Sequence, residues 1–379
     1  MKKITAFAAC ALAALLLGSC GKKEPALPAQ NETRVVVDHN GVEVRIPSKI
    51  HRIVIGSILP LPSVYCLYMG GPKKLVGIHP SSKAAAVNSY LSVCFPEING
   101  ISSDFVKGNT VSIEQLLELK PDLILYNAGN SAEKEIFEST GIPAVGFSTN
   151  IAGYNTIETY ASWITLLGEI FGKTQKCDEI IEYGRKIDGM VKSRTASIPD
   201  DKKPVCLFLY ACEANSITTY GGNMFNQYWI ETCGGKNASY DLKGSAAINM
   251  EQVYQWNPDK IFLTNFTPAL PEDLYTNAIG TYDWSTVKAI QNKEVYKNPL
   301  GMYRWAPPSS DTPLALQWFA KKIQPELFAD IDMDAEITSY FKKFYGVELT
   351  DAQIEAMYHP SGAAGSAASS SSEAASISR

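Results

Sequence analysis

The sequence lacks the glycine-rich loops that cradle phosphate groups, since neither GxGxxG nor GxxxxGK[ST] occurs in its 379 residues. It also lacks the GxSxG elbow of serine hydrolases. Histidine is scarce, with four residues in all, at positions 39, 51, 79 and 359. These absences disfavour nucleotide binding, hydrolase chemistry and a metal site built from histidine and aspartate. We therefore assign no catalytic residue, no metal ligand and no resident cofactor.

Long apolar runs are missing after the first twenty residues. Residues 1–19 combine Lys2 and Lys3 with a short apolar run, which is typical of a signal peptide for export. They end in Leu17-Gly18-Ser19-Cys20, which is similar to the bacterial lipobox, so we predict that Cys20 is lipidated. An ordinary signal peptide followed by a chance cysteine is the alternative. The prediction places the chain outside the cytoplasm, lipid-anchored to the outer face of the bacterial cytoplasmic membrane.

Two further segments are too polar or too low in complexity to build a core. Residues 20–33 predict a flexible linker, and residues 361–379 predict a disordered tail rich in serine and alanine. The formal net charge is −5, and the basic residues do not cluster along the sequence. We therefore do not expect nucleic acid as a partner.

Cysteine is present in eight copies but in no disulfide pattern. Cys10 would leave with the signal peptide, Cys20 would carry lipid, and the remaining six, at positions 66, 94, 177, 206, 212 and 233, include no CxxC pair. Cys206 and Cys212 would lie too far apart on one strand to form a bridge. Buried free thiols are the favoured interpretation, with a disulfide as the alternative that export permits.

Strands alternate with helices between the two polar ends. Alternating residues around Asn40-Gly41 predict a β-hairpin over residues 34–47. The apolar runs RIVI, LVGI, LILY and PAVGF predict a first α/β lobe over residues 34–153, and VCLFLY, KIFL and EVY predict a second over 196–325. Residues 154–195 predict a helical connection with one long helix, and 326–360 predict additional C-terminal helices. The expected fold class is α/β, with two lobes of mostly parallel sheets joined by that single long helix.

One phrase occurs twice, as SIEQLLELKPDLIL from residue 112 and as NMEQVYQWNPDKIFL from residue 249. Each copy predicts a helix, a Pro-Asp turn and a strand, because proline stops the helix. Glu114 and Glu251 occupy matching places, at an offset of 251 − 114 = 137 residues. An acid in the first turn of a helix commonly stabilises the helix through its dipole. The residues alone therefore favour a structural and a functional role of the two glutamates equally.

Candidate ligand-binding residues follow the strands, because ligands of open parallel sheets sit at the carboxyl ends of strands. Arg304 between two aromatic residues could meet an anionic group while the rings cover a flat or apolar face. The alternative is that the rings are core and Arg304 pairs with a local acid. For His79, a role within its loop is favoured over a role as an iron or cobalt ligand. The candidates are Ser57, Leu59, His79, Ser81, Lys83, Asn127, Tyr220, Asn223, Tyr303, Arg304 and Trp305.

Several of these stretches, in this order and spacing, resemble one family of proteins. They are the lipobox at Cys20, VVDHNGVEVRIPSKIHRIVI, IEQLLELKPDLIL, WIETCGGKN and QNKEVYKNP. The chain resembles the solute-binding lipoproteins of ABC importers for ferric siderophores, haem and cobalamin, the class III periplasmic binding proteins. The resemblance covers residues 34 to 325.

The resemblance implies two lobes that grip a metal chelate and deliver it, without chemistry, to an ABC permease and its ATPase. It implies a monomer, with Glu114 and Glu251 as the acids that dock onto the permease. A ferric siderophore or other iron complex is the expected ligand, and a corrinoid such as cobalamin, or haem, is the alternative. The GMYRWAPPSSD loop and the extra C-terminal helices depart from the family pattern. An exported envelope enzyme and an adhesion module are less favoured functions.

Overall fold

The hairpin that opens the fold is tied to the first lobe through one aspartate. The computed structural model describes residues 32–108 and 110–360. β1 (Thr33–Val37) and β2 (Glu43–Pro47) pair antiparallel, as predicted. The Asp38 carboxylate accepts hydrogen bonds from the backbone N–H groups of Asn40 and Val42 in the turn, and from that of Gly146 across the lobe. Asp38 therefore fixes both the turn and its place on the lobe.

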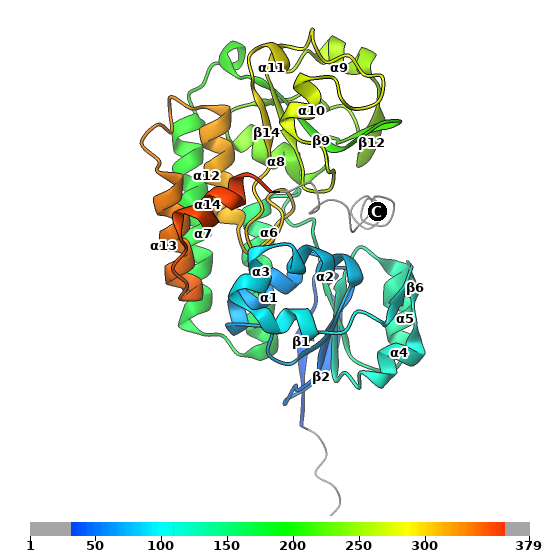
Figure 1. Ribbon diagram of the computed structural model, residues 1–379. Helices are drawn as coiled ribbons and strands as arrows, with labels where there is room; N and C mark the ends of the chain where they lie inside the picture. The colour runs from blue at the N-terminus through cyan, green and yellow to red at the C-terminus, as the bar shows by residue number, and fades with distance from the viewer. Residues whose placement is uncertain (1–31, 109, 361–379) are drawn as a thin grey trace, which may run out of the picture.

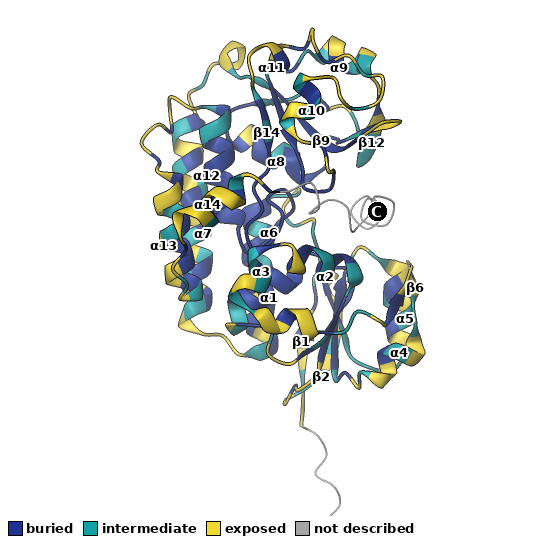
Figure 2. Cartoon of the chain, viewed as in Figure 1, coloured by how far each residue is buried: buried dark blue, intermediate teal, exposed yellow. Residues whose placement is uncertain are grey.

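The amino-terminal lobe is built on a four-stranded sheet in the order β4-β3-β7-β8, with every neighbouring pair parallel. Its strands are β3 (Ile53–Ile55), β4 (Leu75–Ile78), β7 (Leu123–Asn127) and β8 (Ala144–Phe147). Its helices are α1 (Leu61–Met69), α2 (Pro80–Val87), α3 (Tyr90–Cys94), α4 (Ile113–Glu118) and α5 (Ser131–Ser139), with a 3₁₀ turn at Pro96–Gly100 and a small pair β5 (Val106–Lys107) and β6 (Thr110–Val111). Figure 2 shows this sheet in the buried colour, as expected for parallel strands covered on both faces.

The carboxy-terminal lobe has a mixed sheet of six strands. β9 (Val205–Glu213), β13 (Lys260–Leu263), β14 (Val295–Lys297) and β11 (Lys236–Asn237) pair parallel, whereas β10 (Ser216–Tyr220) and β12 (Ser245–Ile248) add an antiparallel edge. The helices are α8 (Phe225–Thr232), α9 (Met250–Trp256), α10 (Pro271–Tyr275) and α11 (Lys288–Gln291), with a 3₁₀ turn at Asp200–Lys202. The sequence pattern did not predict β10 and β12, but the mostly parallel arrangement is confirmed.

The twice-written phrase forms one matching unit in each lobe, α4 with β7 and α9 with β13. The residue before each proline, Lys120 or Asn257, has a left-handed backbone with φ of 48° or 41°. In the first unit, Asp122 accepts from the backbone N–H groups of His51 and Arg52 at 2.7 and 3.0 Å. In the second, Asp259 accepts from the N–H of Val205 at 2.8 Å. Each Pro-Asp turn therefore holds the start of the neighbouring strand, β3 or β9.

Long helices join the two lobes along one side of the molecule (Figure 1). They are α6 (Thr156–Phe171), α7 (Gln175–Thr195), α12 (Thr312–Ile323), α13 (Met333–Tyr345) and α14 (Asp351–Tyr358). The C-terminal helices belong to the main core, since buried Ile337, Tyr340 and Phe341 share one hydrophobic cluster with the first lobe. Tyr340 also donates a hydrogen bond to the backbone oxygen of Ser310. These helices therefore brace the connection between the lobes.

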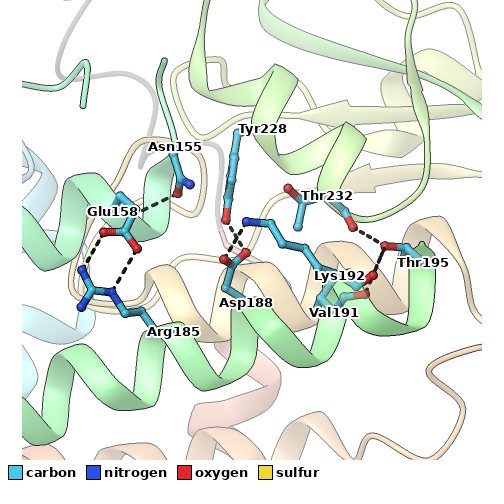
Figure 3. A network of polar contacts seen from close by, with 9 residues as sticks. All are labelled: Asn155, Glu158, Arg185, Asp188, Val191, Lys192, Thr195, Tyr228 and Thr232. Atoms are coloured by element: carbon cyan, nitrogen blue, oxygen red, sulfur yellow. Dashed lines mark hydrogen bonds and ion pairs between the residues drawn. The ribbon is translucent and has the colours of Figure 1, made fainter. Parts of the chain in front are cut away.

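Polar contacts join α7 to α6 and to α8, as Figure 3 shows. Arg185 donates two hydrogen bonds to the carboxylate of Glu158 on α6, at 3.0 and 2.7 Å. Further along α7, Asp188 accepts from the hydroxyl of Tyr228 on α8 and pairs with Lys192 at 2.7 Å. One face of α7 is thus tied both to α6 and to α8, which opposes free rotation of one lobe about the other.

The described part of the chain contains neither a membrane-spanning helix nor a disulfide. Within residues 32–108 and 110–360, no helix is long and apolar enough to cross a membrane. The six cysteines of this part of the chain are free, and all but Cys94 are buried, which confirms the interpretation as buried thiols. The signal peptide, Cys20, most of the linker and the tail lie outside the described residues.

Candidate functional site

A small cavity lies where loops from the two lobes meet. It is lined by Ser57, Ile58, Leu59, Pro60, Asn127, Thr149, Phe225, Phe266, Tyr303, Pro307 and Pro308. Its volume is about 20 Å³, which holds the centres of only one or two water-sized groups. The first six residues follow or end strands of the first lobe, and the others come from the second half of the chain. This is the place that parallel sheets favour for a ligand.

A buried glutamate holds the wall that the first lobe contributes. Both carboxylate oxygens of Glu133 accept from the backbone N–H of Ser57, at 2.9 and 3.1 Å, and one also accepts from its hydroxyl at 2.6 Å. Asn130 donates to the same hydroxyl at 3.1 Å. A Cβ atom at Gly56 would lie 2.7 Å from the Glu133 carboxylate, so glycine leaves the room for it. Burial raises the pKa of Glu133 to about 7, although the bonds from Ser57 oppose the shift.

A buried aspartate holds the opposite wall in a similar way. Asp311 accepts from the backbone N–H of Tyr303 at 3.0 Å and from the indole N–H of Trp305 at 3.2 Å. A Cβ atom at Gly301 would lie 2.6 Å from this carboxylate. Burial raises the pKa of Asp311 to about 7. Asp311 therefore fixes the loop that carries Tyr303 into the cavity.

A buried cation lies directly beside the cavity. Arg304 is 1% exposed, and its guanidinium carbon is 4.4 Å from the centre of the Phe266 ring and 5.7 Å from that of Tyr303. Both rings line the cavity. Lys297 is also buried and donates to three backbone oxygens, and burial together with the charge of Arg304 lowers its pKa to about 7. The fixed positive charge at this place is thus that of Arg304.

Two helices, one from each lobe, begin at the cavity. Pro60, the N-cap residue of α1, and Phe225, the first residue of α8, both belong to its lining. The amino end of a helix carries a partial positive charge. At α1 the N–H groups of Leu61 and Ser63 are bonded to the carbonyl groups of Ile58 and Pro60, so this helix offers the partial charge alone. Together with Arg304, these two helix ends favour a negatively charged occupant.

Four of the sequence candidates line this cavity, namely Ser57, Leu59, Asn127 and Tyr303. Asn127 is 2% exposed, and its side-chain oxygen accepts from the N–H of Gly129 at 3.0 Å. Tyr220 is one layer behind, with its ring centre 5.0 Å from that of the lining residue Phe225. Trp305 is fully buried in the core and packs at 6.4 Å from Trp318.

The other candidates lie outside the lining. His79 caps α2 by accepting from the N–H of Ser81 at 3.2 Å, and burial lowers its pKa to about 4. Lys83 donates to the backbone oxygen of Ile101 at 2.6 Å. Asn223 is exposed and accepts from the N–H of Gly244 at 2.6 Å. The contacts of His79 correspond to the role within its loop that the sequence favoured.

Sequence reasoning missed the two buried carboxyl groups and the rings of Phe225 and Phe266. Glu133 and Asp311 resemble ordinary first-turn or capping acids in the sequence, because helices commonly carry acids at these positions. Their proximity to strand-end glycines, Gly56 and Gly301, becomes visible only in three dimensions. Glu114 and Glu251 are exposed in the first turns of α4 and α9, one on each lobe.

Comparison with known proteins gives the family. A model of the family described as periplasmic binding protein matches residues 69–299. The chain belongs to the periplasmic binding protein family. A solved periplasmic solute-binding protein from Veillonella parvula is 33% identical, with a TM-score of 0.77, and the match covers 86% of this chain and 97% of that one. The expected class III fold of ABC-transporter solute-binding proteins is thereby confirmed.

Curated relatives of this periplasmic binding protein differ in what they bind. The molybdate-binding protein MolA of Haemophilus influenzae is 26% identical over 337 residues, which cover 82% of this chain and 91% of the relative. An iron-uptake system-binding protein of Bacillus subtilis is 24% identical over 319 residues, covering 79% and 91%. The family makes this chain an extracytoplasmic solute-binding component of an ABC importer. Among the residues that the structure describes, no group of three or more His, Cys, Asp or Glu side chains could hold a metal ion.

Proposed function

We propose that this periplasmic binding protein captures a small oxyanion of the molybdate class between its lobes and delivers it to an ABC permease. The observation that carries the proposal is the cavity of about 20 Å³ at the meeting point of the lobes, with a buried arginine beside it. The protein performs no chemistry on the ligand in this role.

Size supports an ion over a large chelate. Pockets for organic ligands of drug size commonly measure about 300–1,000 Å³. The cavity here is far smaller, and Pro307 and Pro308 from the second half of the chain close against Ser57 to Pro60 from the first lobe. A tetrahedral oxyanion with four oxygens needs these walls to open slightly, whereas a large chelate needs a far wider separation.

Charge supports an anion. Arg304 is held within cation–π distance of two lining rings, and α1 and α8 direct their amino ends at the cavity. An anion inside would interact with all three sources of positive potential at low local dielectric. Asn127, Thr149 and Tyr303 add polar groups to the lining that can orient its oxygens.

Isothermal titration of the purified protein with sodium molybdate tests the proposal, with sodium tungstate and a ferric hydroxamate siderophore as parallel ligands. We expect one molybdate per chain, and we expect Arg304→Ala to weaken binding at least about tenfold through loss of a buried charge. Arg194→Ala is the matched control, because Arg194 is an arginine bound to Asp330 at a distance from the cavity. No heat from either oxyanion, with binding of the siderophore, would sink the proposal.

A ferric siderophore or other iron complex, with haem and cobalamin as variants, is the second candidate. The similarity to an iron-uptake binding protein and the apolar part of the lining, Ile58, Leu59, Phe225 and Phe266, favour it. Such a ligand requires the lobes to separate far beyond the present cavity. Native mass spectrometry of protein from its own host distinguishes the candidates, since a chelate adds a much larger mass than an oxyanion.

For delivery, we propose that the chain is a monomer anchored through lipid on Cys20, and that Glu114 and Glu251 contact the permease. The two glutamates are exposed at matching places on the two lobes, which suits a partner that spans both. Cys20 lies outside the described residues, and mass spectrometry of the amino-terminal peptide tests its acylation directly.

A further inference from the structure

Basic residues that are scattered in the sequence come together at one edge of the first lobe. Arg52 and Lys74 stand directly before β3 and β4, and Lys120 stands shortly before β7. Ile53 of β3 is in register with Leu75 of β4 and with Leu123 of β7, so the three strand starts lie side by side. This is the edge opposite to the carboxyl ends that line the cavity. We name Lys49, Arg52, Lys73, Lys74 and Lys120 the basal patch, and all five are exposed.

A hollow of about 410 Å³ adjoins this patch. Arg34, Lys49, His51 and Lys74 contribute to its lining, with Glu169 as the acid among them. Arg34 is engaged with the last carbonyl groups of α6, at Glu169 and Ile170. The nearby carboxylate of Asp122 is already occupied by two backbone N–H groups. The edge therefore presents more positive than negative charge.

Three lysines at the corresponding edge of the second lobe form ion pairs instead. Lys236 pairs with Asp200 at 2.7 Å, Lys260 with Glu294 at 2.6 Å and Lys288 with Asp259 at 3.5 Å. None of the basal-patch residues forms an ion pair with any part of the chain that the structure describes. Lys202, shortly before β9, and Lys293, shortly before β14, are exposed without an ion pair among the described residues, so the second lobe keeps two such lysines where the first has five basic residues.

Backbone geometry does not explain the lysines. Lys74 and Lys120 have left-handed backbones, with φ of 68° and 48°, a conformation that favours glycine or asparagine. The matching position of the second lobe is indeed asparagine, Asn257, with φ of 41°. Lys293, shortly before β14 of the second lobe, has the same conformation with φ of 58°, so lysine at such a turn occurs in both lobes.

We propose that the basal patch rests on the anionic lipid headgroups of the membrane that anchors the chain. The described chain enters at this edge, because Thr33 pairs with Pro47 and Ser48 donates to Glu32, next to Lys49. Only 33 − 20 = 13 residues separate Cys20 from Thr33, a reach of at most about 45 Å. The patch lies where this short tether enters the fold. Contact of the patch with lipid would orient the protein, when it is not bound to the permease, with its cavity directed away from the bilayer. This step rests on the acylation of Cys20 put forward above.

Lysine footprinting by an amine-reactive reagent, read by mass spectrometry, tests the proposal on the intact mature protein in vesicles. On vesicles of equal parts phosphatidylglycerol and phosphatidylcholine, we expect labelling of Lys49, Lys74 and Lys120 to slow about fivefold. The internal controls are Lys186 on α7 and Lys202 and Lys243 in the second lobe, which are exposed, and their labelling should stay constant. Pure phosphatidylcholine or high salt should remove the protection, because both weaken the attraction.

Variants separate this proposal from those on which it rests. Reversal of Lys49, Lys74 and Lys120 to glutamate should remove the protection of Lys73, whereas reversal of the three control lysines, with the same change in charge, should not. Molybdate affinity should be equal in both variants. If the amino-terminal peptide carries no lipid, the anchoring proposal fails, and footprinting of protein added to the vesicles from solution still decides the patch. Equal labelling on both kinds of vesicle, or protection only with the permease present, overturns the lipid contact.

Discussion

The two walls of the cavity are each braced by one buried carboxyl group, but the two groups are satisfied to different degrees. Both oxygens of Glu133 accept hydrogen bonds from Ser57. Asp311 accepts both of its bonds, from Tyr303 and Trp305, on Oδ2. Its other oxygen, Oδ1, is buried without a hydrogen-bond partner among the described residues. The second lobe therefore holds the carboxyl group that gains more from a proton.

This difference bears on how an anion can be held between two acids. A carboxylate near the cavity repels an oxyanion, whereas a protonated carboxyl group does not. With the pKa values of Glu133 and Asp311 raised to about 7, both groups are partly neutral near neutral pH. The charge of Arg304 is then the main electrostatic influence on the ligand. Oxyanion affinity should accordingly rise as the pH falls from 8 to 6.

The largest effect is expected where the lobes match most closely, at Glu114 and Glu251. Changing both to lysine should lower ligand uptake by cells at least about tenfold, because the proposed docking pairs the two acids with basic groups of the permease, and like charges in their place cost several kcal/mol. Each single change should lower uptake less than the double change does, and the two single changes should lower it by similar amounts. Uptake of radiolabelled molybdate by cells measures the loss.

The matched control for this pair is Glu118→Lys with Glu272→Lys, which makes the same change in charge at other exposed acids of the two lobes. Ligand affinity of all variants should equal that of the unchanged protein. A collapse of affinity in the Glu114 and Glu251 variant would assign these residues to the fold or the site and not to docking.

The next effect concerns the two buried acids and depends on pH. Because the folded protein raises the pKa of Asp311 from 3.8 to about 7, the folded state holds a proton that the unfolded state has lost. The contribution of Asp311 to stability therefore falls as the pH rises from 4 to 7, by about 3 kcal/mol. Asp311→Asn does not titrate, so its stability relative to the unchanged protein should rise by this amount. Urea unfolding at several pH values measures the difference.

Glu133→Gln is the comparison variant from the other wall. The pKa of Glu133 rises from 4.5 to about 7. The stability of Glu133→Gln relative to the unchanged protein should therefore also rise with pH, over a narrower pH range, and by about 2 kcal/mol. A difference that is independent of pH for both variants would contradict the account of the walls as neutral carboxyl groups.

The Pro-Asp turns give a third contrast of somewhat smaller size. Asp122 accepts from two backbone N–H groups, and Asp259 accepts from one and forms a loose pair with Lys288. Hydrogen bonds to a charged group contribute about 1.5–3 kcal/mol each, so Asp122→Ala should lower the free energy of unfolding by about 3 kcal/mol and Asp259→Ala by about 1.5. Asp122→Asn keeps one acceptor oxygen and should lose about half as much. Equal losses at Asp122 and Asp259 would show that the turn, not the bonds, sets the effect.

The sequence predicts the fold better than it predicts the site. Apolar periodicity locates the parallel strands of both sheets, α6, α7 and the hairpin, because burial on both faces of a strand leaves long apolar runs such as LILY. It does not locate β10 and β12, whose polar residues serve an antiparallel edge. Strand-end loops yield Ser57, Asn127 and Tyr303 as lining residues, since topology alone places such loops together. Glu133 and Asp311 are not predicted, because the local sequence of a helix-capping acid does not differ from that of a buried acid that supports a loop.

The smallest loss of stability is expected at α7, whose polar contacts with α6 and with α8 differ in strength. The pair of Glu158 with Arg185 is exposed, with side-chain exposures of 35% and 56%, so Glu158→Gln should lower stability by only about 0.5 kcal/mol. The loss should disappear in 1 M salt, where the screening length falls to about 3 Å. Asp188 is more buried and also accepts from Tyr228, so Asp188→Asn should cost more and respond less to salt. Unfolding in urea at low and high salt measures both, and a larger loss from Glu158→Gln would mean that α7 depends more on the first lobe than on the second.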